Sequence, residues 1–234
     1  MSLFNRCLDL VFPQRCPVCL NSSDSFLTAP ICSACWSSVR PVTGNLCNVC
    51  CRPILLKSDD TPPVVCEDCD SLKPSYASVL AFGLYDGVLR EAIIKYKFSS
   101  LKRLSRPLSD LLCSMPIPHA DLMVSVPLTK NRLIERGFNQ TLLLAHHLSR
   151  EYRINLLDDC LVKVRDTGHQ VKLSRQQRLS ALHNAFEVKS DVKGKRLLLI
   201  DDVLTTGATI NECAKMLLRA GATEVFGIVL ARTV

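Results

Sequence analysis

The sequence predicts an α/β fold, in which a small cysteine-rich domain precedes a central, mostly parallel sheet flanked by helices. Two observations lead to this prediction. Ten of the 13 cysteines fall before residue 70. From residue 76 onward, strand-like and helix-like segments alternate along the chain. Because the composition changes around residues 72–76, we expect one domain over residues 1–75 and another over residues 76–234.

Local patterns predict the individual elements of the second domain. Leu89, Ile93 and Phe98 recur on one helical face, and Gly221 is a typical residue just after a helix end. Apolar runs predict strands at residues 78–85, 122–126, 161–164, 196–200 and 225–230. Amphipathic patterns predict helices at residues 88–98, 103–115, 139–152 and 210–220. The repeated order of strand, loop and helix is typical of a parallel sheet.

The composition fits a packed protein of the cytoplasm. Hydrophobic residues make up 47% of the chain, which is enough for a buried core. No apolar run approaches the roughly 18 to 20 residues of a membrane span, and residues 1–12 lack the uninterrupted apolar core of a signal peptide. We therefore expect no membrane span and a cytoplasmic location, in which the cysteines stay reduced.

Positive charge is concentrated in the middle of the chain. The net charge is +7, and residues 90–178 carry 16 Lys and Arg against 8 Asp and Glu. Such a segment attracts anions, among them pyrophosphate, a nucleotide or a nucleic-acid backbone. Charge alone does not choose among these ligands.

Four C-x-x-C pairs dominate the first domain, which has too few large apolar residues for a conventional core. Two thiolates separated by two residues can face one ion, and two such pairs complete a tetrahedral site with no position left for a substrate. The sequence therefore predicts structural zinc, held by Cys16, Cys19, Cys32, Cys35, Cys47, Cys50, Cys66 and Cys69.

Two points about these cysteines stay open. Pairing in sequence order and an interleaved cross-brace use the same eight ligands. Cys51 either replaces Cys50 as a ligand or packs in the interior. Redox activity of one C-x-x-C pair is the competing interpretation, although such pairs normally open a helix beside a sheet, a context that this segment lacks.

The run from Leu197 to Thr209 carries the most chemical information. Residues 197–200 predict a buried strand that delivers Asp201 and Asp202 to its carboxyl end, where open α/β sheets bind ligands. The following hydroxyls, one glycine and the start of a helix can hold a phosphate. A solvated turn would need none of these residues, whereas a ribose 5-phosphate needs acceptors for its hydroxyls and a site for its phosphate.

This run resembles the phosphoribosyl diphosphate (PRPP) signature of type I phosphoribosyltransferases nearly residue for residue, which implies the type I phosphoribosyltransferase fold for the second domain. The resemblance also implies that the two aspartates face the ribose hydroxyls, with Mg²⁺ nearby, while residues 205–209 hold the 5-phosphate. The expected PRPP site consists of Asp201, Asp202, Val203, Leu204, Thr205, Thr206, Gly207, Ala208 and Thr209.

Two further segments extend the expected ligand site. Lys130, Arg132 and Arg136 belong to an expected pyrophosphate-binding loop after the strand at residues 122–126, where they can stabilise the charge that grows on a pyrophosphate leaving group. A solvated helix end is the alternative for these three cations. Residues 165–186 are polar, basic and long for an internal connection, which indicates a functional loop that closes as a lid. The candidate residues of this flexible loop are Arg165, Gln170, Arg175 and Arg178.

Together, the cysteine pairs, residues 126–140, residues 165–186 and the PRPP run resemble the ComF family of competence proteins over almost the whole chain. The resemblance implies a zinc-binding cysteine domain followed by a phosphoribosyltransferase-like domain. It also implies a role in natural transformation, with single-stranded DNA and other competence proteins, such as a DNA-uptake helicase, as partners. Trp36, Phe98 and Phe138 are the aromatic candidates for base stacking, unless they lie in the core.

Three functions stay open from the sequence. The first is a PRPP-binding module in DNA uptake, and the second is an active phosphoribosyltransferase that moves phosphoribose to a base- or nucleotide-type acceptor. The third is a PRPP-sensing regulator, for which no helix-turn-helix reader is visible. Thr205 stands where purine-salvage relatives often have an acidic general base, so the residues support binding better than turnover.

Overall fold

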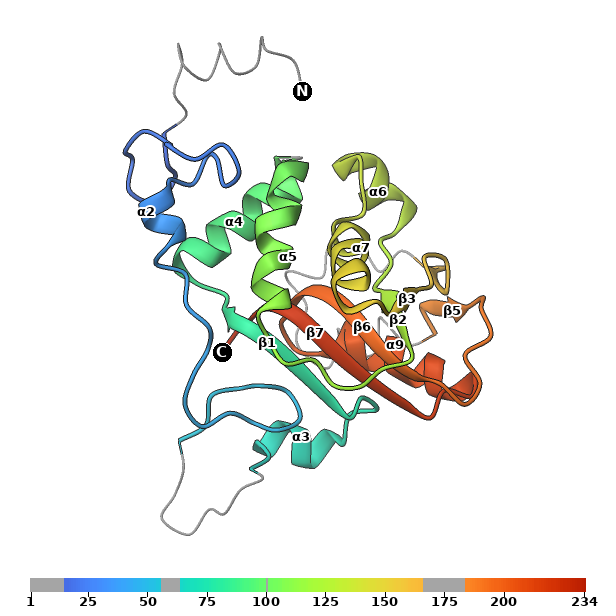
Figure 1. Cartoon of the computed structure of the whole chain (residues 1–234). Coiled ribbons are helices and arrows are strands. Elements are labelled where there is room, and N and C mark those ends of the chain that lie inside the picture. Colours follow the sequence, from blue (N-terminus) through green and yellow to red (C-terminus); the bar gives the residue numbers. More distant parts are fainter. Residues whose placement is uncertain (1–14, 56–63, 100, 166–183) are drawn as a thin grey trace.

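The computed structural model describes residues 15–55, 64–99, 101–165 and 184–234 (Figure 1). Its centre is a five-stranded sheet with the order β1-β7-β6-β2-β3, in which every neighbouring pair is parallel. This arrangement confirms the predicted α/β class. A separate antiparallel pair is formed by β4 and β5. The strands are β1 (Ser78–Leu84), β2 (Leu122–Ser125), β3 (Asn155–Leu156), β4 (Leu161–Lys163), β5 (Phe186–Val188), β6 (Arg196–Leu204) and β7 (Glu224–Arg232).

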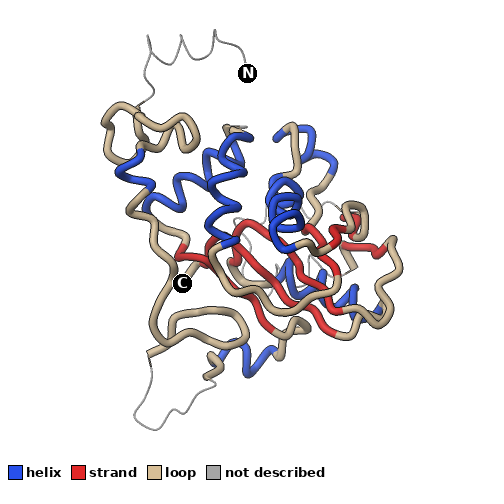
Figure 2. Tube along the Cα trace, in the orientation of Figure 1, coloured by secondary structure: helices blue, strands red, loops and turns tan. Residues whose placement is uncertain are grey.

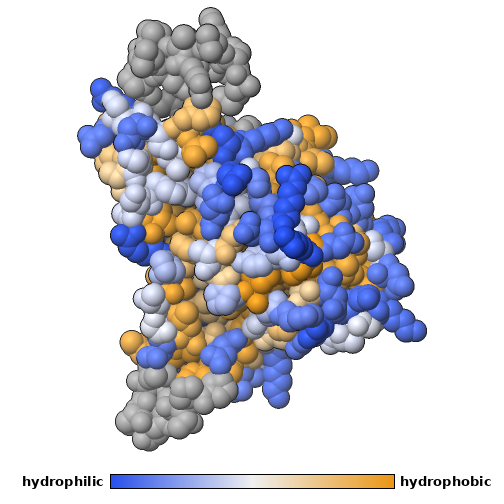
Figure 3. Space-filling model, viewed as in Figure 1, coloured by the Kyte–Doolittle hydropathy of each residue, from blue (hydrophilic) through white to orange (hydrophobic). Residues whose placement is uncertain are grey.

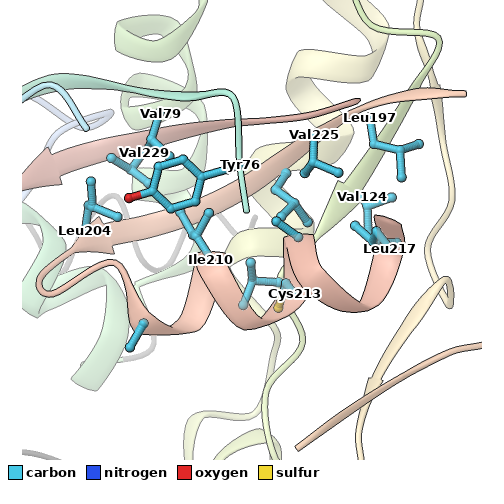
Figure 4. Close-up of a cluster of buried hydrophobic side chains, with 14 of the residues drawn as sticks. Tyr76, Val79, Val124, Leu197, Leu204, Ile210, Cys213, Leu217, Val225 and Val229 are labelled. Carbon is cyan, nitrogen blue, oxygen red and sulfur yellow. The ribbon is translucent and has the colours of Figure 1, made fainter. Parts of the chain in front are cut away.

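Helices lie on both sides of the sheet (Figure 2). Successive residues of a strand point to opposite faces. Leu198 and Ile200 of β6 therefore join a core with α4, α5 and α7, whereas Leu197 and Leu199 join a second core with α9 (Figure 4). No helix within the described ranges has both the length and the apolar content that crossing a bilayer requires. The helices are α2 (Ser33–Trp36), α3 (Glu67–Leu72), α4 (Gly87–Phe98), the 3-10 turn η1 (Lys102–Leu104), α5 (Ser105–Cys113), α6 (Lys130–Arg136), α7 (Gln140–Tyr152) and α9 (Ala208–Arg219).

The cysteine-rich region packs along the edge of the sheet at β1. The Val79 N–H donates a hydrogen bond to the Val49 carbonyl at 2.8 Å, and the Val42 N–H donates to the Phe82 carbonyl at 2.7 Å. Cys16 and Cys32 belong to the core on the α4 side, with Cys35 packed against it, whereas the cysteines of residues 47–69 belong to the core on the α9 side. The cysteine-rich region and the sheet therefore share both hydrophobic cores.

Most expected elements match the structure within a few residues, but two expectations were wrong. β6 continues through both aspartates to Leu204, because it pairs with β7 as far as Arg232. Asp201 and Asp202 thus lie inside a strand rather than after it. Residues 130–136 form the helix α6 rather than a loop, and the Thr129 side chain caps it by accepting a hydrogen bond from the Arg132 N–H at 3.3 Å.

Candidate functional site

Two motif-bearing segments leave the sheet at the same edge. β2 and β6 are adjacent and parallel, so their carboxyl ends lie side by side. The segment after β2 leads into α6, and the segment after β6 leads into α9. Since ligands of parallel sheets bind at this edge, the fold brings the expected cations of residues 130–136 to the same edge as the PRPP run.

The two aspartates of the PRPP run point to opposite faces of β6. Asp202 faces α4, whereas Asp201 lies towards α9, where its carboxylate adds to burial in raising the pKa of the Cys213 thiol. The Asp202 N–H donates a hydrogen bond to Asp201 Oδ1 at 2.8 Å. A ligand that contacts both carboxylates must therefore lie across the end of the strand.

Asp202 forms an ion pair with Lys97, the penultimate residue of α4. Lys97 Nζ lies 2.7 Å from Asp202 Oδ1, and the two side chains are only 15% and 11% exposed. Arg136 is a second cation near Asp202. Burial lowers the pKa of its guanidinium, and the negative charge of Asp202 acts in the opposite direction. Lys97 was missed by the sequence analysis, which assigned residues 88–98 only to an amphipathic helix.

Asp201 has the most strongly perturbed carboxyl group of the site. The residue is half-buried, and its carboxyl group is surrounded by neighbouring atoms. This burial, and then the Asp202 carboxylate, raise the pKa of Asp201 to about 7. The hydrogen bond from the Asp202 N–H and the charges of Lys97 and Lys163 act in the opposite direction. Such a perturbed acid at a sheet edge is typical of a ligand-binding or catalytic site.

A tight turn connects β6 to α9. Thr205 is exposed and Thr206 is half-buried, and the Thr206 hydroxyl accepts a hydrogen bond from the Ala208 N–H at 3.4 Å. Gly207 has a φ of +77°, a left-handed conformation that glycine adopts without strain. The turn therefore leads hydroxyls and the N–H groups of the 12-residue α9 to the sheet edge, an arrangement suited to a phosphate.

Three residues of the expected PRPP run are apolar and pack inside. Leu204 and Ala208 lie in the core on the α9 side, and Val203 packs against the core on the α4 side. Their side chains hold the turn in place, so only their backbone groups are available to a ligand.

The three cations of residues 130–136 occupy different environments. Lys130 is exposed and Arg132 is half-buried. Arg136 is buried, and its guanidinium donates a hydrogen bond to Gln140 Oε1 at 3.0 Å. A cleft of about 410 Å³ opens between α6 and β4, with Lys130 and Lys163 in its lining. The helix thus presents Lys130 to this cleft, whereas Arg136 serves the interface between α6 and α7.

The expected flexible loop lies largely outside the described residues, which include neither Gln170 nor Arg175 nor Arg178. Arg165, just after β4, is described and exposed. β4 carries the chain towards this loop, and Lys163 of β4 lines the cleft beside α6. The described start of the loop therefore adjoins the cleft.

The eight cysteines predicted as ligands form two separate clusters. Cys16, Cys19, Cys32 and Cys35 form one, and Cys47, Cys50, Cys66 and Cys69 form the other, with all sulfur atoms of a cluster within 4.8 Å of one another. Sγ atoms lie 3.6 Å apart between Cys19 and Cys32 and between Cys50 and Cys66. Tetrahedral zinc-thiolate bonds of about 2.3 Å place sulfurs about 3.8 Å apart, so both clusters fit zinc.

This grouping follows sequence order, and it excludes the cross-brace. Cys51 belongs to neither cluster, because its thiol faces the Ala81 carbonyl at 3.8 Å and its backbone has a φ of +58°. Cys160 and Cys213 are buried in the core on the α9 side, whereas Cys113 is half-buried.

The second cysteine cluster adjoins the turn of the PRPP run. A small cavity of about 70 Å³ lies between them, and its lining includes Cys69 on one side and Thr206 and Gly207 on the other. The Ser75 N–H donates a hydrogen bond to Asn211 Oδ1 of α9 at 2.7 Å. The Arg232 guanidinium donates to the Cys50 carbonyl. The second cysteine cluster and the turn between β6 and α9 therefore lie close together in the fold.

Comparison with known proteins supports both halves of this architecture. A family model for a double zinc ribbon domain matches residues 7–70, and a family model for a phosphoribosyl transferase domain matches residues 140–233. The fold and the cysteine clusters thus define a zinc-ribbon protein with a phosphoribosyltransferase-like domain.

Relatives that match most of this chain identify the family. DNA utilization protein YhgH of Escherichia coli K12 is 33% identical over 228 residues, which cover 88% of this chain and 99% of that protein. Competence protein F of Haemophilus influenzae is 33% identical, and the alignment covers 68% of this chain and 75% of that protein. Competence protein ComFC of Bacillus subtilis is 29% identical, with 89% and 88% covered. The chain belongs to the ComF family.

Solved structures match parts of this chain at lower similarity. The PRPP amidotransferase of B. subtilis, complexed with ADP and GMP, matches 58% of this chain at 21% identity and a TM-score of 0.42, and the match spans 30% of that enzyme. The purine phosphoribosyltransferase of Pyrococcus horikoshii matches 58% of this chain and 75% of its own, at 20% identity and a TM-score of 0.31.

Proposed function

We propose that this protein binds PRPP at the carboxyl edge of its sheet and acts in the handling of incoming single-stranded DNA during natural transformation. The junction of β6 and α9 is the observation that carries the proposal, because two aspartates, a glycine turn and a helix N-terminus follow one another there. Relatives named competence protein F, ComFC and DNA utilization protein supply the biological context.

The charges of the edge complement those of PRPP. In this proposal the 5-phosphate occupies residues 205–209, where the N-terminus of α9 favours an anion. The ribose hydroxyls face Asp201 and Asp202, and the diphosphate extends towards the cleft between α6 and β4. Lys130 and Lys163 supply positive charge to this cleft. Both anionic ends of PRPP thus meet groups of opposite charge.

Mg²⁺ belongs to the proposed ligand, whereas zinc belongs to the fold. Mg²⁺ prefers carboxylate and phosphate oxygens together with water, and the carboxylates of Asp201 and Asp202 fit this preference. When bound, the ion neutralises part of the diphosphate charge. The two cysteine clusters leave no open ligand position, so their zinc is structural.

Transfer of phosphoribose to a base- or nucleotide-type acceptor is the second candidate function. The cleft of about 410 Å³ beside the sheet edge favours it, because an acceptor must reach the sugar. Thr205 is exposed at the start of the turn, and its hydroxyl does not act as a base near neutral pH. Pyrophosphate release upon addition of bases, nucleosides or DNA ends tests this function.

A basic and apolar surface near α6 supports the contact with single-stranded DNA. Phe98 is 64% exposed, and the Arg136 guanidinium lies 5.2 Å from its ring centre. Leu133 and Ile134 of α6 are also exposed, and an apolar patch lies over α6 in Figure 3. Of the other two aromatic candidates, Phe138 is buried and Trp36 is half-buried. An exposed aromatic ring beside cations suits base stacking with phosphate contact.

Calorimetric titration with PRPP, with and without Mg²⁺, tests the proposed site. We expect Asp201→Ala with Asp202→Ala to lower the affinity by about 10- to 100-fold, the effect of lost hydrogen bonds to charged groups. Asp158→Ala with Asp159→Ala is the matched control, since this Asp pair is exposed in the turn before β4. Equal affinity in both double variants would refute the assignment.

Transformation assays on the same variants connect the site to the biology. We expect the Asp201 and Asp202 double variant to transform poorly and the Asp158 and Asp159 variant to transform normally. Lost PRPP affinity with normal transformation would separate the ligand site from DNA handling.

A further inference from the structure

The ion pair between Lys97 and Asp202 occupies a carboxylate that the proposed function assigns to a ribose hydroxyl. Lys97 Nζ lies 2.7 Å from Asp202 Oδ1, and little of either side chain is exposed. An ammonium group at this distance takes up one of the two carboxylate oxygens. A ribose hydroxyl that is to use this oxygen must therefore displace Lys97.

The backbone of Lys97 is held in place, so only its side chain can respond. Tyr96 donates a hydrogen bond from its hydroxyl to the Gln140 carbonyl at 2.9 Å, and the Gln140 side chain donates to the Lys97 carbonyl at 3.5 Å. These contacts fix the end of α4 to the start of α7. The flexible four-carbon stem of lysine still allows its ammonium group to move at the sheet edge.

A displaced ammonium group needs a new anion, because an unpaired charge in a largely buried position is costly. Asp202 already has a second cation nearby in the buried Arg136. Positive charge is thus in excess on this side once Asp202 exchanges the Lys97 ammonium group for a neutral ribose hydroxyl. PRPP supplies the missing anion, since its diphosphate is attached to the same ribose whose hydroxyls reach Asp202.

We propose that Lys97 is a ligand for the diphosphate of PRPP, held by Asp202 in the unliganded protein and released to the diphosphate when the ribose hydroxyls take its place. This inference rests on the proposed PRPP site. It assigns α4, which precedes both expected anion-binding segments, to the binding machinery. Because both partners of the ion pair then gain a new contact, the protein favours ligands that carry both a ribose and a diphosphate.

Comparison of PRPP with ribose 5-phosphate tests the proposal, because only PRPP carries the diphosphate. Lys97→Met should lower the affinity for PRPP by about tenfold or more, while the affinity for ribose 5-phosphate stays equal or rises as Asp202 becomes free. Lys97→Arg should restore part of the PRPP affinity. Lys95→Met is the matched control on the same helix, and it should leave both affinities unchanged. A parallel loss for both ligands would overturn the proposal.

A double-mutant cycle covers the case in which Lys97→Met does not fold with Asp202 left unpaired. Lys97→Met with Asp202→Asn removes both charges, and its affinities are compared with those of Asp202→Asn alone. If Lys97 contacts the diphosphate, its removal lowers PRPP affinity about tenfold further in this background. No further loss would show that Lys97 serves only Asp202. If the wild-type protein binds no PRPP, the proposed function fails, and this inference fails with it.

Discussion

The hydroxyl of Tyr76 lies against Gly207, only 3.1 Å from the position that a Cβ atom on this glycine would occupy. Tyr76 follows the cysteine-rich region, and Gly207 forms the turn before α9. Burial raises the pKa of the Tyr76 phenol, in agreement with its enclosed position. The contact therefore joins the zinc-bearing region to the proposed phosphate site through one buried side chain.

Gly207→Ala should impair PRPP binding. The substitution places a side chain at a φ of +77°, which costs about 1–2 kcal/mol, and its methyl group meets the Tyr76 hydroxyl. We expect about a tenfold loss of PRPP affinity by calorimetry. Tyr76→Phe combined with Gly207→Ala removes the steric contact but not the backbone strain, so it should recover only part of the loss. Full wild-type affinity of Gly207→Ala would contradict the role of the turn.

Loss of the second zinc cluster should affect PRPP binding more than loss of the first. Cys69 lines the cavity that borders Thr206 and Gly207, whereas Cys35 belongs to the first cluster, on the α4 side. Cys69→Ser and Cys35→Ser should each lower the zinc content from two equivalents to one. Only Cys69→Ser should weaken PRPP binding and speed hydrogen exchange in residues 205–209. Equal effects of both variants would show that zinc acts through overall stability.

PRPP affinity should increase with pH around neutrality. Asp201 has a pKa of about 7, so its carboxyl group is protonated below this pH. Above this pH the carboxylate is charged and accepts a hydrogen bond from a ribose hydroxyl. Affinity should therefore rise as the pH increases from about 6 to about 8. PRPP phosphates titrate in the same range, so Asp201→Asn is the reference, and its pH dependence should be shallower. Equally steep profiles for both proteins would exclude Asp201 as the titrating group.

Phe98→Ala should weaken binding of single-stranded DNA. Stacking of one base on an aromatic ring contributes about 1–3 kcal/mol, so an affinity loss of about fivefold or more is expected in a fluorescence anisotropy titration. Leu55→Ala is the control, because Leu55 is 95% exposed in the cysteine-rich region. Binding should also weaken with salt, with a slope of about −0.7 per phosphate contacted. Affinity that does not depend on salt would rule out the phosphate contacts.

The contiguous parts of the site were predictable from the sequence. Asp201, Asp202 and the turn at residues 205–209 lie in one run, and four C-x-x-C pairs in one short segment are typical of zinc ligands. The pairing of the cysteines was not predictable, since the same spacing serves both arrangements. The tertiary fold decides the pairing, because the first two pairs lie against one core and the last two against the other.

The parts of the site that sequence analysis missed depend on tertiary contacts. Aspartate disfavours strands, yet β6 continues through Asp201 because Val229 of β7 pairs with it. Lys97 meets Asp202 only because α4 and β6 pack together, and no local pattern distinguishes it from Lys95. Helix α6 did carry local signals, namely the cap residue Thr129 and the left-handed Gly137 at its end.

The position of β7 has a consequence for synthesis of the chain on the ribosome. β7 lies between β1 and β6 in the sheet, and its Arg232 reaches the Cys50 carbonyl beside the second zinc cluster. Until residues 224–232 have emerged, β1 and β6 have no hydrogen-bonded partner between them, and the cysteines of that cluster lack one wall of their core. In a nascent chain of this protein, the sheet and the core around the second zinc cluster therefore close only after β7 has been synthesised.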